Sequence, residues 1–218
     1  MISLADHGGG GKHPRIRRCV CQETVDLDRR RRYLEDIDGL SARERSLAFG
    51  GLRRADNNRA IESVEQAVGR RKGLITLTGK PGTGKTTLLI CAVNAARERG
   101  IPAVYVVMAD LLDYLRAAYN PTVTTTLTFD ARWELLTHAE VLAIDEMDQF
   151  NATQWATERF LLLIDERWRN MDTRLTLLAT NSRLVELPDK VYSRLRDGRA
   201  YTYSMAGPDV RPALRDDR

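Results

Sequence analysis

Short apolar runs alternate along the chain with longer stretches in which apolar and polar residues recur at helical spacing. The runs are rich in leucine and β-branched residues and too short for buried helices, which favours strands buried on both faces. Because strands and helices alternate, we expect an α/β fold with a doubly wound, mostly parallel sheet and helices on both faces. Five core strands are predicted, near residues 74–78, 103–108, 141–145, 175–180 and 200–204.

Start and stop signals place the helices between these runs. Ser41 and Glu44 have the spacing of a capping box, which predicts a short helix after Ser41. A helix that begins at Lys85 is expected to end before Gly100 and Pro102, since neither residue continues a helix. Further helices are expected over residues 24–40, 57–68, 110–119, 129–138, 153–169 and 188–195, with a loop over 120–128.

A glycine-rich loop follows the first predicted strand and leads into a helix. The stretch Leu74–Leu89 contains G-x-x-x-x-G-K-[ST] in the strand, loop and helix order of a phosphate-binding loop. Its glycines permit positive φ angles, and its N–H groups and helix N-terminus attract phosphate. A glycine turn that binds nothing is the alternative, but the intact motif favours a nucleoside triphosphate. The expected nucleotide-binding residues are Gly79, Lys80, Pro81, Gly82, Thr83, Gly84, Lys85, Thr86 and Thr87.

The side chains after this loop and after the third strand indicate the chemistry. Lys85 is expected to reach the β and γ phosphates, and the Thr86 hydroxyl to hold Mg²⁺. Asp145 and Glu146 follow a buried strand, where acids are costly unless a cation lies nearby. We therefore expect ATP and Mg²⁺ as cofactors, Asp145 as a metal residue and Glu146 as the base that deprotonates the attacking water. The alternative is that the two acids merely start a loop.

Asn181 follows the fourth predicted strand and is the third polar landmark. A polar side chain at this strand tip would lie beside the γ-phosphate and could position the attacking water. The competing interpretation is an asparagine that initiates a turn. Together these residues predict an ATPase.

The composition excludes several other classes of protein. The 218 residues suit one domain with a short appendage, and 43% hydrophobic residues suffice for a core. No apolar run is long enough to cross a bilayer, and the first 18 residues lack the apolar segment of a signal peptide. Cys19, Cys21 and Cys91 give no disulfide framework. We therefore expect a cytoplasmic protein with no membrane partner.

The formal net charge of +4 is concentrated near the N-terminus. Residues 1–72 contain 16 Lys and Arg against 11 Asp and Glu, and residues 73–218 contain 18 against 19. This excess is compatible with a nucleic acid partner and is also common on solvated surfaces. In the same region Cys19 and Cys21, with two histidines nearby, are either half of a zinc site or two free thiols.

Five landmarks occur in an order that resembles one family. They are Thr78–Thr86, Met108–Leu112, Val141–Glu146, Ala179–Ser182 and Lys190–Leu195. Over these landmarks the chain resembles the DnaC-type helicase loaders, and the IstB-type transposition helper ATPases look similar over the same region. Both belong to the AAA+ class of P-loop ATPases. The resemblance implies an AAA+ ATPase domain over residues 45–205. The residues outside it are expected to form a basic, partly flexible N-terminal segment over 1–44 and a polar tail over 206–218. The chain is expected to depart from many AAA+ proteins in having no C-terminal helical lid.

The resemblance also assigns roles to single residues. The phosphate-loop and acidic residues keep the roles already given. Asn181 falls on the γ-phosphate sensor. Arg194 falls on the arginine finger, which in this family reaches the ATP of a neighbouring subunit, and Arg196 and Arg199 are close competitors.

The function that the resemblance implies is that of an ATP-dependent replicative helicase loader. Such a protein would oligomerise into a ring or spiral, bind single-stranded DNA, contact a replicative hexameric helicase and hydrolyse ATP. The first alternative is an IstB-like transposition helper that forms a filament on double-stranded DNA and activates a transposase. The second is an ATP-gated scaffold with slow hydrolysis, against which Glu146 argues. The Cys-x-Cys at Cys19 favours the loader over the transposition helper.

Overall fold

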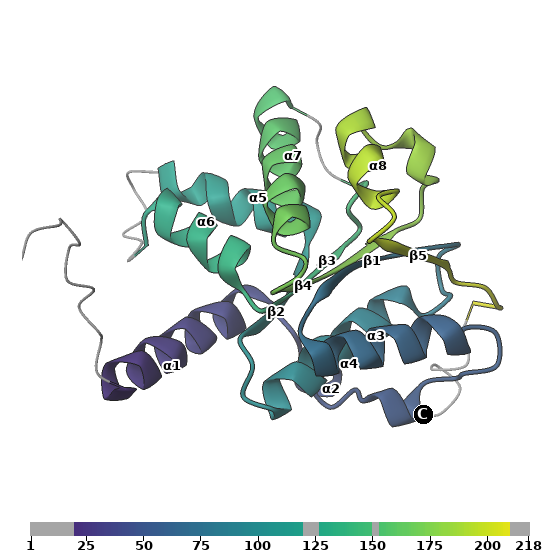
Figure 1. Cartoon of the computed structure of the whole chain (residues 1–218), viewed down its shortest axis with the longest axis horizontal. Coiled ribbons are helices and arrows are strands. Elements are labelled where there is room, and N and C mark those ends of the chain that lie inside the picture. Colours follow the sequence, from purple (N-terminus) through teal and green to yellow (C-terminus); the bar gives the residue numbers. More distant parts are fainter. Residues whose placement is uncertain (1–19, 120–126, 150–152, 210–218) are drawn as a thin grey trace, which may run out of the picture.

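A central sheet between two layers of helices organises the computed structural model of the chain (Figure 1). The structure describes residues 20–119, 127–149 and 153–209, with side chains from residue 26 onward. The zinc hypothesis for Cys19 and Cys21 therefore falls outside the described side chains. Among those described, no three His, Cys, Asp or Glu residues are grouped as a metal site requires, and Cys91 is a buried free thiol. None of the described helices combines the length and apolar content that crossing a bilayer demands.

The sheet has the five strands that the apolar runs predict, in the order β2-β3-β4-β1-β5. All four pairings are parallel, so the described sheet is fully parallel rather than mostly so. The second strand ends at Val107, one residue earlier than expected, because Met108 already begins the next helix. The strands are β1 Gly73–Thr78, β2 Ala103–Val107, β3 Val141–Asp145, β4 Leu175–Thr180 and β5 Tyr201–Ser204.

Eight α-helices are present in the described part of the chain, with three short 3₁₀ turns. Each expected helix forms, with ends that differ by a few residues at most, and the helices at Lys85 and Phe129 have the expected limits. Most of the expected loop after Tyr119 lies outside the described residues. The α-helices are α1 Val20–Ile37, α2 Ala42–Arg45, α3 Asn58–Arg70, α4 Lys85–Glu98, α5 Met108–Arg116, α6 Phe129–His138, α7 Gln154–Arg169 and α8 Asp189–Leu195, and the 3₁₀ turns are η1 Phe49–Gly51, η2 Ala117–Tyr119 and η3 Leu184–Glu186.

Two hydrophobic clusters fill the space on the two faces of the sheet. Helices α3 and α4 cover one face, and α5, α6, α7 and α8 cover the other (Figure 1). Successive residues of β1 alternate between the clusters, as a pleated strand requires: Leu74 belongs to the second and Ile75 to the first. Both residues are almost fully buried. The sheet is therefore a rigid platform whose strand ends can hold side chains in fixed positions.

The segment before the sheet is attached to the rest of the domain by a buried asparagine and a buried leucine. Ser41 and Glu44 form the expected capping box at α2. The buried Asn94 of α4 donates hydrogen bonds to the carbonyl oxygens of Glu44, at 2.8 Å, and Leu47, at 2.9 Å. Leu34 of α1 is fully buried in the second cluster. These contacts hold residues 34–47 against α4 and the second cluster, while the division of the chain at residue 44 stays a prediction.

Candidate nucleotide-binding site

The carboxyl ends of β1, β3 and β4 meet at one edge of the sheet and enclose a small pocket of about 100 Å³. The sequence predicts site residues in four separate segments, and the structure brings residues of three of them to this pocket. β3, β4 and β1 are neighbouring parallel strands, so their carboxyl ends lie side by side and the residues that follow them come together. The pocket is lined by Pro81, Gly82, Gly84, Lys85, Thr86, Thr87, Asp145, Glu146, Thr180 and Asn181.

The loop between β1 and α4 has the backbone that its glycines allow. Gly79, Gly82 and Gly84 have φ angles of 141°, 82° and 92°, which L side chains rarely adopt. The Lys85 side chain is buried, and its Nζ donates to the carbonyl oxygens of Gly79 at 2.7 Å and of Lys80 at 2.9 Å. The ammonium group is thus held against the loop, beside the N-terminus of α4. This concentration of positive charge is suited to an anion.

Asp145 is buried at the end of β3 and its carboxylate has a fixed orientation. One oxygen, Oδ1, accepts from the backbone N–H of Glu146 at 2.9 Å, and Oδ2 accepts from the hydroxyl of Tyr105 at 3.0 Å. Burial, and then the negative charge of Asp145, raise the pKa of Tyr105 well above its usual value, so the phenol stays protonated and donates. Sequence reasoning missed Tyr105. The available signal was a phenol within an otherwise apolar buried run, since a buried tyrosine hydroxyl normally has a partner.

Glu146 follows Asp145 in a strained backbone conformation. Its φ angle is 48°, in the left-handed region that few residues other than glycine occupy. The backbone of the next residue, Met147, is fixed to the neighbouring strand β4, because its N–H donates to the carbonyl oxygen of Ala179 at 3.0 Å. The Glu146 side chain is exposed and lines the pocket. Strain of this kind persists where neighbouring contacts impose it, and is common at functional sites.

The tip of β4 supplies the remaining wall of the pocket. Thr180 is buried and Asn181 is exposed beside it. Ser182 donates from Oγ to Oδ2 of Asp148 at 2.7 Å, which joins this tip to the segment after β3. Burial opposes ionisation of Asp148, but hydrogen bonds from Ser182 and Thr180 outweigh it and lower the pKa of its carboxyl group. Asn181 is therefore carried by two connected strand ends.

A larger cavity of about 630 Å³ adjoins the loop and shares Gly84 and Thr87 with the small pocket. Its walls are mainly apolar, and the side chains of Leu47, Leu52 and Met205 contribute to them. An apolar cavity with a few polar groups, next to an anion site, has the size and chemistry for a nucleoside. Other residues around it are Ser41, Arg43, Glu44, Asp56, Asn57, Ile61, Thr83, Leu88, Ala206, Gly207 and Pro208.

Comparison with known protein families gives a match over residues 44–190 to the family described as IstB-like ATP binding protein. The match contains the loop, the acidic pair and the β4 tip, and it spans more than half of the chain. The chain belongs to this family. Membership in an ATP-binding family, together with the pocket described above, supports nucleotide binding. The match ends at Lys190, before Arg194.

Solved structures similar to this family member have the same fold. The DnaC helicase loader structure has a TM-score of 0.61 at 20% identity, covering 76% of this chain and 100% of that chain. The DnaI structure has a TM-score of 0.60 at 18% identity, and the match covers 79% of this chain and 95% of that chain. The structure of AMPPCP-bound DnaA from Aquifex aeolicus has a TM-score of 0.65 at 19% identity, and the match covers 83% of this chain and 56% of that chain. These likenesses confirm the AAA+ P-loop fold that the sequence resemblance implies.

One curated relative, YqaM from Bacillus subtilis (strain 168), is described as uncharacterized. It is 27% identical over 115 residues, which are 50% of this chain and 34% of the relative. The chain therefore matches about a third of that protein's length.

The segment after β5 crosses the phosphate loop of this IstB-like chain. The N–H of Met205 donates to the carbonyl of Thr78 at 2.7 Å, and a side chain on Gly79 would begin 2.3 Å from the carbonyl oxygen of Met205. A Cβ on Gly82 would lie 2.0 Å from Oδ1 of Asp209. The Asp209 carboxylate thus rests on the loop, where phosphate is expected. Sequence reasoning treated residues 206–218 only as a polar tail and did not find this contact.

Arg194 does not line the pocket of its own chain. Its Nε and Nη2 donate to Oδ1 of Asp165 at 2.9 and 2.8 Å, and its guanidinium lies 4.0 Å from the ring centre of Trp168. Of the competitors, Arg196 donates to the hydroxyl of Tyr192 at 2.8 Å, and Arg199 lies over the same Trp168 ring at 5.0 Å. A role for Arg194 at the site of a neighbouring subunit stays a prediction.

Proposed function

We propose that this IstB-like chain is an ATP-dependent replicative helicase loader that acts in the cytoplasm as an oligomer on single-stranded DNA. The observation that carries the ATPase part is the convergence of Lys85, Asp145 and Glu146 on one pocket beside an apolar cavity of nucleoside size. The loader part is supported by the likeness in fold to a DnaC helicase loader over that protein's whole described length.

The residues of the pocket fit Mg²⁺ and a triphosphate. The Thr86 hydroxyl and the Asp145 carboxylate are the oxygen donors that Mg²⁺ prefers, and Asp145 is oriented by two hydrogen bonds. When bound, the metal supplies positive charge next to the phosphates. Lys85 is already held against the loop and would add a second positive charge.

Hydrolysis requires a base and a means of positioning water. Glu146 is exposed at the pocket and would accept the proton of the attacking water. Asn181 lines the same pocket and would hold that water in line with the γ-phosphate. Both residues directly follow buried strands, which fixes the backbone that carries their side chains.

We further propose that each site is completed by Arg194 of a neighbouring subunit. The Asp165 pair and the Trp168 ring hold the Arg194 guanidinium in one orientation on the surface of α8. Its side chain is about one third exposed, so its positive charge is accessible to a second chain. A shared site makes ATP binding dependent on assembly into a ring, spiral or filament.

Substitution Glu146→Gln tests the base. The change preserves the shape of the side chain and removes its basicity, so ATP turnover should fall by about 10²-fold or more while ATP binding persists. Glu158→Gln, at an exposed position of α7, is the matched control and should hydrolyse ATP normally. Turnover at the wild-type rate by Glu146→Gln would refute the assignment.

The shared site is tested by mixing two inactive variants. Lys85→Ala lacks a working phosphate site and Arg194→Ala lacks the arginine, so each alone should be inactive at high protein concentration. In an equimolar mixture some interfaces combine an intact Lys85 with an intact Arg194, and activity should return. A mixture that stays inactive, or an active Arg194→Ala variant, contradicts the shared site.

The second candidate is an IstB-type transposition helper on double-stranded DNA, and the family match favours it. The two functions differ in the DNA that stimulates hydrolysis. An ATPase rate per chain that rises with protein concentration and with single strands supports the loader. Stimulation by duplex DNA with filament formation would replace the loader by the transposition helper. A rate unaffected by concentration and DNA would exclude both and leave an ATP-gated scaffold.

A further inference from the structure

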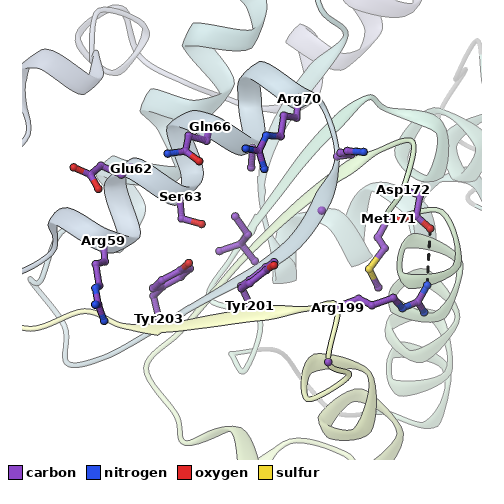
Figure 2. A pocket seen from close by; sticks show the side chains of 15 residues that line it. Arg59, Glu62, Ser63, Gln66, Arg70, Met171, Asp172, Arg199, Tyr201 and Tyr203 are labelled. Atoms are coloured by element: carbon purple, nitrogen blue, oxygen red, sulfur yellow. Dashed lines mark ion pairs between the residues drawn. The ribbon is translucent and has the colours of Figure 1, made fainter.

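A second large cavity lies between α3 and the edge strand β5, away from the phosphate loop (Figure 2). Its volume is about 760 Å³, and its floor includes Gly73 and Ile75 from the start of β1. The phosphate loop follows the other end of that strand, and the cavity shares no lining residue with the small pocket or with the nucleoside cavity. The cavity is therefore separate from the nucleotide site. The remaining residues around it are Arg59, Glu62, Ser63, Gln66, Ala67, Arg70, Lys72, Met171, Asp172, Gly198, Arg199, Tyr201 and Tyr203.

Positive charge surrounds this cavity. Arg59 and Arg70 extend from α3 at its two ends, Lys72 follows that helix, and Arg199 precedes β5 (Figure 2). Among the described residues that line the cavity, only Glu62 and Asp172 have carboxylates. Arg199 is the one of these cations with ion-pair partners in the described part of the chain, Asp172 at 3.9 Å and Asp197 at 3.1 Å. Within the described ranges, no ion pair involves Arg59, Arg70 or Lys72. Cations without local partners around a hollow are suited to a polyanion.

Two tyrosines form the side of the cavity opposite α3. Tyr201 and Tyr203 are two residues apart on β5, so their rings lie on the same face of the strand, toward the helix (Figure 2). Tyr201 is 57% exposed, an unusual fraction for a large ring next to a cavity. On α3, Ser63 and Gln66 point into the same space and offer hydrogen-bond donors and acceptors. The walls thus combine exposed aromatic surface with polar groups.

We propose that this cavity binds a segment of single-stranded nucleic acid. Arg59, Arg70 and the neighbouring cations contact phosphates, and a base stacks on Tyr201. Aromatic rings inside a positively charged groove are the usual composition of such sites, since every base has a face that can stack. An acidic peptide would use the cations but not the exposed ring, so the tyrosines favour a nucleic acid. The inference rests on the DNA-binding part of the proposed function and gives it a location.

The same two elements border the nucleoside cavity. Asn57 and Ile61, at the start of α3, line that cavity, and so does Met205, which directly follows β5. A ligand bound between α3 and β5 could change the distance between these two elements, and so the shape of both cavities. Nucleic acid in the α3–β5 cavity should change the affinity for ATP, and ATP should change the affinity for nucleic acid by the same factor.

The test is titration of a fluorescent thymidine 20-mer by anisotropy at several salt concentrations. Tyr201→Ala should weaken binding by about tenfold, and Tyr201→Phe, which keeps the ring, should bind as the unchanged chain does. The double variant Arg59→Ala, Arg70→Ala should also bind more weakly. The logarithm of the binding constant falls with the logarithm of the salt concentration. Because two phosphate contacts are lost, this negative slope should become less steep by about 1.4. The control is Arg183→Ala, at the well exposed residue that precedes η3; it removes one positive charge away from the cavity and should change neither quantity.

Each outcome decides one point. If these variants bind the 20-mer with unchanged affinity and slope, the location is wrong and the proposed function stands. If the unchanged chain binds no single strand at any salt concentration, the DNA-binding part of the proposed function fails as well. If polyglutamate of equal charge competes as strongly as the 20-mer and Tyr201→Ala has no effect, the cavity is an acidic peptide site and the inference is overturned. Unchanged ATP turnover without DNA in all variants verifies that they are folded.

Discussion

The hydroxyl group of Tyr105 donates a hydrogen bond of 3.0 Å to the carboxylate of Asp145, across the neighbouring strands β2 and β3. The two residues are 40 positions apart, and both are buried. Asp145 also accepts the backbone N–H of Glu146, and it lines the pocket. The carboxylate is therefore oriented before any ligand arrives.

Removal of this phenol tests how much the orientation matters. Tyr105→Phe should lower ATP turnover by about tenfold, because side chains that orient metal-binding carboxylates contribute 10–100-fold in affinity or activity. The free energy of unfolding should change by no more than about 1.5 kcal/mol. The measurements are the Mg²⁺ dependence of turnover and urea unfolding. Tyr114→Phe removes a hydroxyl elsewhere, and if it has the same effect on turnover, Tyr105 has no special role.

Gly79 is expected to tolerate no side chain. A Cβ there would approach the Met205 carbonyl oxygen to 2.3 Å, and the φ angle of 141° is itself unfavourable for other residues. Gly79→Ala should therefore lower the free energy of unfolding by about 2–4 kcal/mol, as backbone strain and overpacking add. Gly50→Ala is the control, since its Cβ meets no atom within 4 Å and should cost less than about 0.5 kcal/mol. Equal urea midpoints for the two variants would contradict this description of the loop.

The carboxylate of Asp209 lies where the phosphates of a nucleotide are expected, so the two negative groups should compete. Asp209→Asn removes the charge and keeps the size of the side chain. Affinity for a fluorescent ATP analogue should rise by about fivefold, a modest gain because the residue is exposed and screened by solvent. Asp113→Asn on α5 is the control. An unchanged or lower affinity of Asp209→Asn would mean that the tail does not oppose binding.

The hydrogen bond from Ser182 to Asp148 predicts a dependence of stability on pH. The pKa of Asp148 in the folded chain is below its usual value of 3.8, so its contribution is present above pH 3.8 and is lost as the pH falls through the lower folded value. Ser182→Ala should cost about 1 kcal/mol near pH 6, discounted for the partial exposure of Asp148. That difference should shrink below pH 3.8. A difference that is constant with pH in urea unfolding would show that Asp148 is not the partner that matters.

The sheet could be predicted from the sequence because its signals are local. Runs such as 141–145 and 175–180 are continuous, apolar and bounded by polar residues, and they form the strands expected. The phosphate loop is equally local, since one short motif contains its turn, its lysine and its helix start. Once the strands are known to be parallel, the meeting of Asp145 and Asn181 at one pocket follows from the fold.

The contacts that sequence reasoning missed join residues of different helices, strands and loops. Arg167 illustrates the difficulty, because an arginine near the end of an amphipathic helix is typical of a solvated surface. In the structure it is fully buried, and it donates to Oγ1 of Thr176 at 2.8 Å and to the carbonyl oxygen of Ala139 at 2.6 Å. Burial lowers its pKa to about 9. No local pattern contains the positions of these acceptors, and the same holds for Asp209 on the loop.

The position of β1 in the sheet has a consequence for the way the chain folds. This strand, which carries the phosphate loop, pairs with β4 and β5, and the register joins Gly73 to Leu175 and Ile75 to Tyr201. Both partners are synthesised about a hundred residues or more after β1, so the sheet has high contact order and should close late. A nascent chain that already contains the whole phosphate loop still lacks both neighbours of the strand before it. Until β4 leaves the ribosome, β1 is an apolar strand with two open edges, and one edge stays open until β5 follows. This interval is when aggregation competes with folding.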